Sequence, residues 1–177
     1  MDRCVPARYY PEMDELLSPW SEFNVAMLGA TAALAGLVIV AASVNIAKII
    51  ESGSSSLIAR LASGIASLLL ALIASGLALV PAITPLWFGV LLLGATIASA
   101  VFQVHAARMI FADPRSAAPA RTLKAALGFL PVLAYLAAAA TAIAGHPSAL
   151  YLCAAGCMLA IISAVVVSWV ALVEVLR

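Results

Sequence analysis

The sequence predicts an all-α integral membrane protein in which five transmembrane helices form an up-and-down antiparallel bundle. Hydrophobic residues make up 66% of the chain, charged residues only 10%, and the mean hydropathy is +1.16. A soluble domain averages about a quarter charged residues, so lipid is expected to be the main solvent. The apolar residues fall into five runs, each with at least the roughly 20 residues that a helix needs to cross the hydrocarbon core. The runs do not alternate in segments of about ten residues, which excludes transmembrane strands.

The chain divides into a polar tail, residues 1–22, and a transmembrane domain, residues 23–177. The tail holds two arginines and five acids, a net charge of two minus five, or −3. Its acids, prolines and aromatic residues suit a short interfacial helix from about Pro11 to Leu17, and a partly ordered tail is the alternative. The expected spans are residues 23–50, 57–80, 86–111, 122–144 and 149–173. Short breaks rich in Gly, Pro and Ser join them, so consecutive helices are expected to pack antiparallel.

The positions of the basic residues predict the orientation. Of nine Lys and Arg residues, two precede the first span and seven flank the first break, the third break and the C-terminus. With five spans, those three places share one side of the membrane. Because Lys and Arg favour the cytoplasmic side, the N-terminus is expected outside and the C-terminus in the cytoplasm.

Small residues predict where the helices pack, because lipid tails are as apolar as leucine and close backbone contact drives association. In the first span, Gly29 and Gly36 share one side with Ala33 and Ser43, while Thr31 lies nearly opposite. Two distinct faces of this kind favour a central position for the first helix. In the fifth span Gly156, Ala160 and Ala164 recur every four residues, which marks a second packing face.

Glu174 is the most informative charged residue. It lies eighteen residues beyond Gly156, five whole helical turns, and therefore on the small-residue face of the fifth span. An acid at this depth is costly unless it is paired, which predicts a polar layer at the cytoplasmic end of the bundle. The expected members are Glu174, Asn45, Lys48, Arg108, His105 and Gln103, with Arg60 as a further candidate partner. A structural clamp is the favoured interpretation, and a proton- or ligand-sensing site is the alternative.

Two terminal motifs carry a family resemblance. Residues 29–37 (GATAALAGL) and 40–45 (VAASVN), with 169–177 (WVALVEVLR) at the other end, resemble a largely uncharacterised family of small bacterial multi-pass membrane proteins. Leu79-Val80-Pro81 after the second span fits the same pattern. The resemblance implies a five-helix membrane protein with Asn45 and Glu174 as signature positions. It implies no substrate, reaction or cofactor.

The motifs of several chemistries are missing from the sequence. His105 and His146 are expected at opposite ends of the bundle, which disfavours bis-histidine haem. Cys153 and Cys157 share a helix face, but with no third ligand nearby they are interpreted as packing residues. There is no nucleophile elbow, zinc-protease motif or phosphate-binding loop. We therefore expect no enzyme activity, no cofactor and no nucleic-acid partner.

The favoured function is an accessory or assembly subunit of a membrane complex, or a homo-oligomeric bundle, in the plasma (inner) membrane. The expected partners are membrane lipid and, for these roles, a larger complex or further copies of the chain. The alternative is an oligomeric channel or small-solute transporter. Its candidate lining residues are Ser63, Ser67, Thr96, Ser99 and Gln103, which lie on one face of the second span and one face of the third. Gly128 with Pro131 predicts a kink in the fourth helix.

Overall fold

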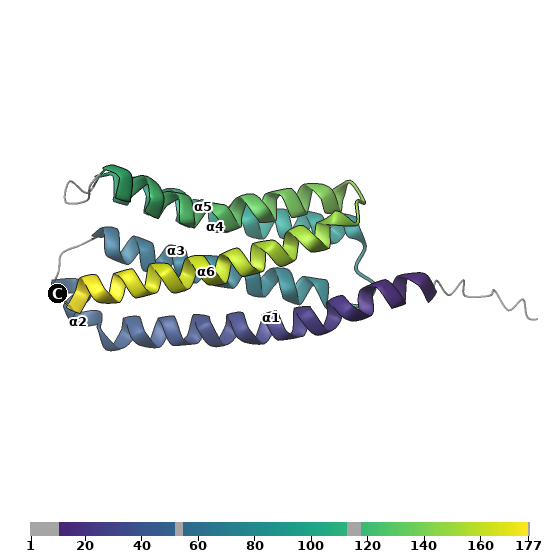
Figure 1. The fold of residues 1–177 in the computed structure, drawn as a ribbon, viewed down its shortest axis with the longest axis horizontal. Coiled ribbons are helices and arrows are strands. Elements are labelled where there is room, and N and C mark those ends of the chain that lie inside the picture. The colour runs from purple at the N-terminus through teal and green to yellow at the C-terminus, as the bar shows by residue number, and fades with distance from the viewer. Residues whose placement is uncertain (1–10, 52–54, 113–117, 177) are drawn as a thin grey trace, which may run out of the picture.

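The computed structural model describes residues 11–51, 55–112 and 118–176, and these form helices joined by short turns. The helices are α1 (Pro11–Val44), α2 (Ile46–Glu51), α3 (Ser55–Ala78), α4 (Pro85–Ala112), α5 (Ala118–Ile143) and α6 (Ser148–Leu176). All but α2 are long and apolar enough to cross a membrane, which confirms the predicted all-α class and the five span-length helices. Figure 1 shows these five side by side along one axis, with the start of α1 and the C-terminus at opposite ends.

The first apolar run forms two helices rather than one. Residues 11–17, expected as a separate interfacial helix or a partly ordered tail, are the first turns of α1, which continues unbroken to Val44. Asn45 lies in a turn before α2, and its side-chain Nδ2 donates a hydrogen bond to the Ala41 carbonyl, 2.9 Å away. An Asn side chain that bonds nearby backbone competes with the helical ladder, which accounts for a break at this position.

The two described turns at the α1-start end of the bundle have local sequence causes. Thr84 precedes α4, where its Oγ1 accepts a hydrogen bond from the Trp87 N–H, and Pro85 occupies the first helical position. At the end of α5, Gly145 has a φ of 71°. The Gly145 N–H bonds the Ala142 carbonyl and the His146 N–H bonds the Thr141 carbonyl, which is the Schellman pattern. Both turns are therefore set by residues within a few positions of the helix ends.

α3, and not α1, is the central helix. Of the most apolar 18-residue window of each span, 61% is buried in α3 but only 11% in α1. α3 lies against α1, α4 and α6, with Leu68, Ala71 and Ala74 fully buried. α1 packs on α3 through Ala35, which belongs to a cluster with Leu68 and Ala164 of α6. The expectation that the first helix is central is wrong, since its second face has no neighbour among the described residues.

α4 and α5 approach each other closely at Gly89. A Cβ atom added there would lie 2.7 Å from the Ile143 Cγ1, 2.9 Å from the Ile143 backbone nitrogen and 3.0 Å from the Ala139 carbonyl oxygen. Two of these three atoms belong to backbone, so a side chain at residue 89 would push the helices apart. The packing of this helix pair therefore depends on the absence of a side chain at Gly89.

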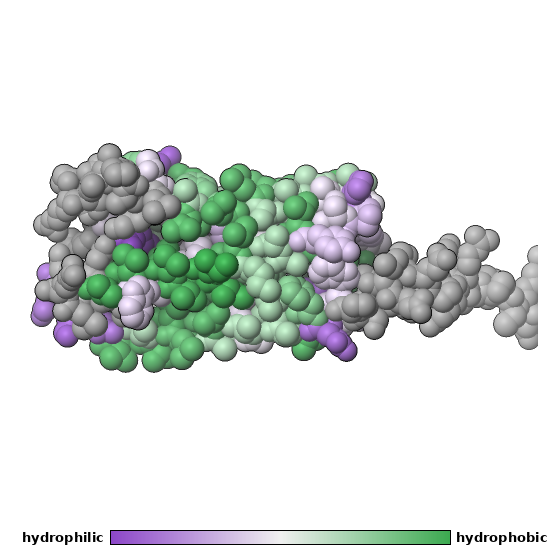
Figure 2. Space-filling model, viewed as in Figure 1, coloured by the Kyte–Doolittle hydropathy of each residue, from purple (hydrophilic) through white to green (hydrophobic). Residues whose placement is uncertain are grey.

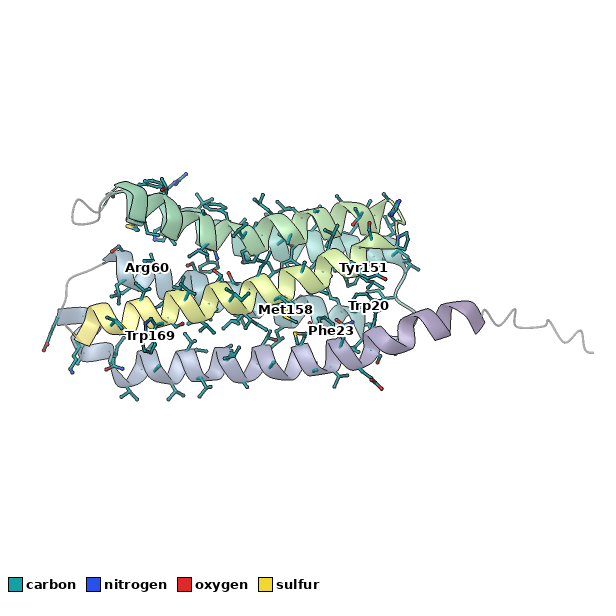
Figure 3. All side chains as sticks on the ribbon, in the orientation of Figure 1. Trp20, Phe23, Arg60, Tyr151, Met158 and Trp169 are labelled. Carbon is teal, nitrogen blue, oxygen red and sulfur yellow. The ribbon has the colours of Figure 1, made fainter. Side chains whose placement is uncertain are left out.

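The outer surface is apolar around the middle and polar at its two ends. In Figure 2 the hydrophilic residues of the visible face gather at the ends, with hydrophobic residues between them. At the α1-start end, the ring of Trp20 packs edge-on against Tyr151 of α6 with the ring centroids 5.0 Å apart. Trp169 of α6 lies toward the opposite end (Figure 3). Tryptophan and tyrosine near both ends of an apolar band are typical of membrane-spanning bundles.

Candidate functional site

Gln103 is the centre of the main polar site inside the bundle. Its side chain is 3% exposed, and its Nε2 donates hydrogen bonds to the Ser63 carbonyl at 3.0 Å and the Ser67 Oγ at 2.7 Å. The Ser67 Oγ in turn donates to the Ser63 carbonyl, 3.1 Å away. We call Gln103, Ser63 and Ser67 the Gln103 cluster. It joins α4 to the central helix α3 through bonds that the apolar surroundings cannot replace.

α5 completes this site because Gly128 leaves room for the amide. A Cβ atom at Gly128 would lie 2.5 Å from the Gln103 Oε1, so the oxygen rests against the bare backbone of α5. Pro131, one turn later in α5, has no N–H to pair with the Leu127 carbonyl. Gly128 and Pro131, singled out in the sequence for a kink, thus lie where α5 receives a polar side chain from α4.

A small cavity of about 30 Å³ adjoins the Gln103 cluster. It lies between α3, α4, α5 and α6, and its polar lining comes from Arg60, Ser63 and Gln103. Arg60 is only 5% exposed, an unusual burial for a guanidinium, and it has an interaction partner. A polar cavity of this size has room for about one water molecule. The site is therefore suited to hold one water molecule at a place where four helices meet.

The five candidate conduit residues all lie inside one protomer. Ser63, Ser67, Thr96, Ser99 and Gln103 are each 5% exposed or less. The Thr96 hydroxyl bonds the Leu92 carbonyl of its own helix, which satisfies it locally. The Ser99 Oγ is buried and has no hydrogen-bond partner among the described residues. A passage lined by these residues would run through the protomer rather than between copies.

A second polar cluster joins α3, α5 and α6 around Cys157. The Tyr135 hydroxyl donates to the Cys157 sulfur at 3.1 Å, and the Ser75 Oγ lies 3.5 Å from the same sulfur. Tyr135 is fully buried, and its ring packs against Gly156, where an added Cβ would lie 3.0 Å from ring carbons. Cys153 and Cys157 are buried free thiols. No group of three or more His, Cys, Asp or Glu side chains suited to a metal occurs in the described part of the chain.

The members of the predicted polar layer occupy different environments. Asn45 is half-buried and donates to the Ala41 carbonyl of α1, and Lys48, His105 and Arg108 are exposed. Gln103 is directed to α3 as described above. The side chain of Glu174 lies outside the described residues, so the layer around it remains a prediction. Its backbone belongs to α6.

The two predicted small-residue faces also differ. On α6, Ala160 and Ala164 are fully buried and Gly156 packs against Tyr135, so this face lies inside the bundle. On α1, Gly29 and Gly36 are exposed, and a Cβ at either would meet no described atom within 4 Å. The glycines of α1 therefore face outward, while the opposite side of the helix makes its contacts within the chain.

Two packing features escaped the sequence analysis. Gly89 is surrounded by the same kinds of apolar residue as Gly94, yet Gly89 is enclosed and Gly94 faces open space. The Tyr135–Cys157 hydrogen bond joins residues of two helices, and no local sequence pattern shows that these two side chains meet. The one usable signal was the burial expected of two cysteines and a tyrosine within apolar spans.

Comparison with known proteins gave no relative: no family model, no curated protein and no solved structure matches this chain.

Proposed function

We propose that this protein is a non-enzymatic, five-span membrane protein that acts as an accessory or assembly subunit, binding a neighbouring transmembrane helix through α1. The docking face, which we call the outward face of α1, consists of Gly29, Ala33, Gly36, Val40 and Ser43. In a bacterial cell the chain resides in the plasma (inner) membrane. Its N-terminus is outside and its C-terminus is in the cytoplasm, as the basic residues favour.

The observation that carries this proposal is the outward direction of the glycines of α1. Gly29 and Gly36 are seven residues apart, about two turns, so they lie on one line along the helix. Both have open space beside them, and Val40 on the same face is 59% exposed. Glycine and alanine let two helix backbones approach closely in lipid, where packing and not hydrophobicity drives association. A helix face of this kind suits a partner helix better than it suits lipid.

The partner is either a subunit of a larger complex or a second copy of the chain. The polar clusters support a structural role. Gln103 on α4 donates a hydrogen bond to α3, and Cys157 on α6 accepts one from α5, and such bonds between helices hold the bundle together. The bundle thus supplies a rigid support, and α1 supplies the contact. A homo-oligomer would use the same face.

The test is purification of the tagged full-length chain from native membranes in a mild detergent, followed by mass measurement. A fixed ratio to a larger complex, or a defined homo-oligomer, is expected. Gly36→Leu should abolish the association and leave the fold intact, because residue 36 borders open space. Gly94→Leu is the matched control, since Gly94 is also exposed but lies on α4. A monomer with no co-purifying protein, or equal behaviour of the two variants, would reject the docking role.

The second candidate is a conduit for ions or small solutes. The feature that favours it is the Gln103 cluster with its adjoining cavity, which is a polar site within apolar helices. Reconstituted protein that carries flux, with flux lost in Gln103→Leu or Ser99→Ala, would establish the conduit and displace the accessory role. Flux that persists in both variants would show that a conduit uses other residues.

A further inference from the structure

An apolar groove of about 250 Å³ lies between α1 and α6 at the α2 end of the bundle. Leu37 and Val38 of α1 form one wall, and Val165 and Trp169 of α6 form the other. Ile49 of α2 also lines it. Ile49 is only 2% exposed, whereas Leu37 is 65% exposed, so the groove is closed by α2 and open along its side.

The walls of the groove favour a hydrocarbon chain. Ser168 is the one lining residue with a polar side chain among those described, and all the others are apolar or aromatic. An apolar cavity of about 150 Å³ holds a benzene ring with its six carbon atoms. At the same volume per carbon atom, this groove has room for roughly ten carbon atoms. Both walls belong to helices that are long and apolar enough to cross a membrane. The side opening of the groove therefore faces acyl chains.

Trp169 in the groove wall and Lys48, the sequence neighbour of the groove residue Ile49, are groups that suit a phosphate. Lys48 lies in α2, four residues beyond the end of the α1 span at Val44, and it is exposed. Trp169 is 70% exposed, so its indole N–H is available as a donor. Lysine and tryptophan at the end of a span reach the headgroup level of the membrane. In the sequence, the first break, the third break and the C-terminus are flanked by seven Lys or Arg and three acids, a net charge of +4 (seven minus three).

The geometry points to a binding site for one anionic glycerophospholipid in this groove. One acyl chain lies between α1 and α6, and the phosphate is bound by the Lys48 ammonium and the Trp169 indole N–H. Charge complementarity selects this occupant, because each Lys or Arg near the membrane surface raises the affinity for anionic lipid roughly fivefold. The site requires only that the chain is embedded in a membrane. It does not rest on docking through α1. Leu37 and Ala41 lie about 80° to 120° around the helix from Gly29, and Leu37 lies about 40° from Ala33 at the edge of the outward face.

The test uses the full-length protein in a mild detergent with phosphatidylglycerol or phosphatidylcholine of identical acyl chains. Native mass spectrometry should find one retained lipid, with phosphatidylglycerol preferred. Lys48→Gln should lower that preference by about fivefold without affecting the fold, because Lys48 is exposed. Ala41→Phe should fill the groove and abolish retention of either lipid, whereas Ala98→Phe, at an exposed position on α4, should not.

A second measurement locates the lipid in the groove. In a Trp20→Phe, Trp87→Phe variant, Trp169 is the remaining tryptophan, and acyl-brominated phosphatidylglycerol should quench its fluorescence in a saturable way. Ala41→Phe should remove the saturable part. The proposal is overturned if Lys48→Gln leaves the lipid preference unchanged. It is equally overturned if Ala41→Phe leaves the quenching unchanged. A third contrary result would be that dimerisation shields the Trp169 side chain from solvent in the absence of lipid.

Discussion

The Tyr135 hydroxyl on α5 donates a hydrogen bond to the Cys157 sulfur on α6, 3.1 Å away, in a fully buried site. Tyr135→Phe removes the donor and keeps the ring against Gly156. We expect a loss of about 0.6 kcal/mol of unfolding free energy and no more than about 1.7 kcal/mol, which are the average and the largest values for hydrogen bonds between membrane helices. Reversible unfolding in mixed micelles measures it. In a double-mutant cycle with Cys157→Ala, additive losses would show that the two groups do not interact.

Gln103 and Gly128 should behave as an interacting pair. Gly128→Ala places a Cβ 2.5 Å from the Gln103 Oε1, and the amide cannot move away without breaking its bonds to Ser63 and Ser67. We expect a loss of about 1–3 kcal/mol, as in other overpacked sites. In a Gln103→Ala background the added methyl should cost much less, because the obstructing oxygen is gone. Equal costs in the two backgrounds would contradict this packing.

Gly89 and Gly94 provide a matched pair on α4. Gly89→Ala should lower the unfolding free energy by about 1–3 kcal/mol, because the new methyl meets the α5 backbone at Ile143 and Ala139. Gly94→Ala should be neutral or stabilising by up to about 1 kcal/mol, because it borders open space and alanine is the better helix former. A similar response of the two variants in thermal unfolding would mean that α4 and α5 do not meet at Gly89.

Glu174→Gln distinguishes the two interpretations of the residue given by the sequence. If Glu174 is a structural clamp, the variant should unfold at a lower temperature and give a lower yield of folded protein, because a paired acid loses its charge. The check is thermal unfolding in detergent beside the unaltered chain. Unchanged stability together with a changed association or flux would reject the clamp in favour of a working site.

The helices could be predicted from the sequence because span length and apolarity are local properties of the chain. The direction of each helix face could not. Small residues do not show whether their helix face lies inside the chain, as for Ala160, or on its outer surface, as for Gly36. Local bonding by Asn45 also ended the first helix within an apolar run that hydropathy alone treats as continuous. In the same way, Gln103 was identified as polar and membrane-embedded, but its partners Ser63 and Ser67 depend on the packing of α3 against α4.

The most direct test of the account is the location of the two chain ends relative to the membrane. Tags placed at Met1 and Arg177 can be probed in intact cells with a reagent that does not cross the membrane, and again after permeabilisation. Five crossings predict that the Met1 tag reacts in intact cells and the Arg177 tag only after permeabilisation. Reaction of both tags under the same condition would require an even number of crossings and would contradict the account.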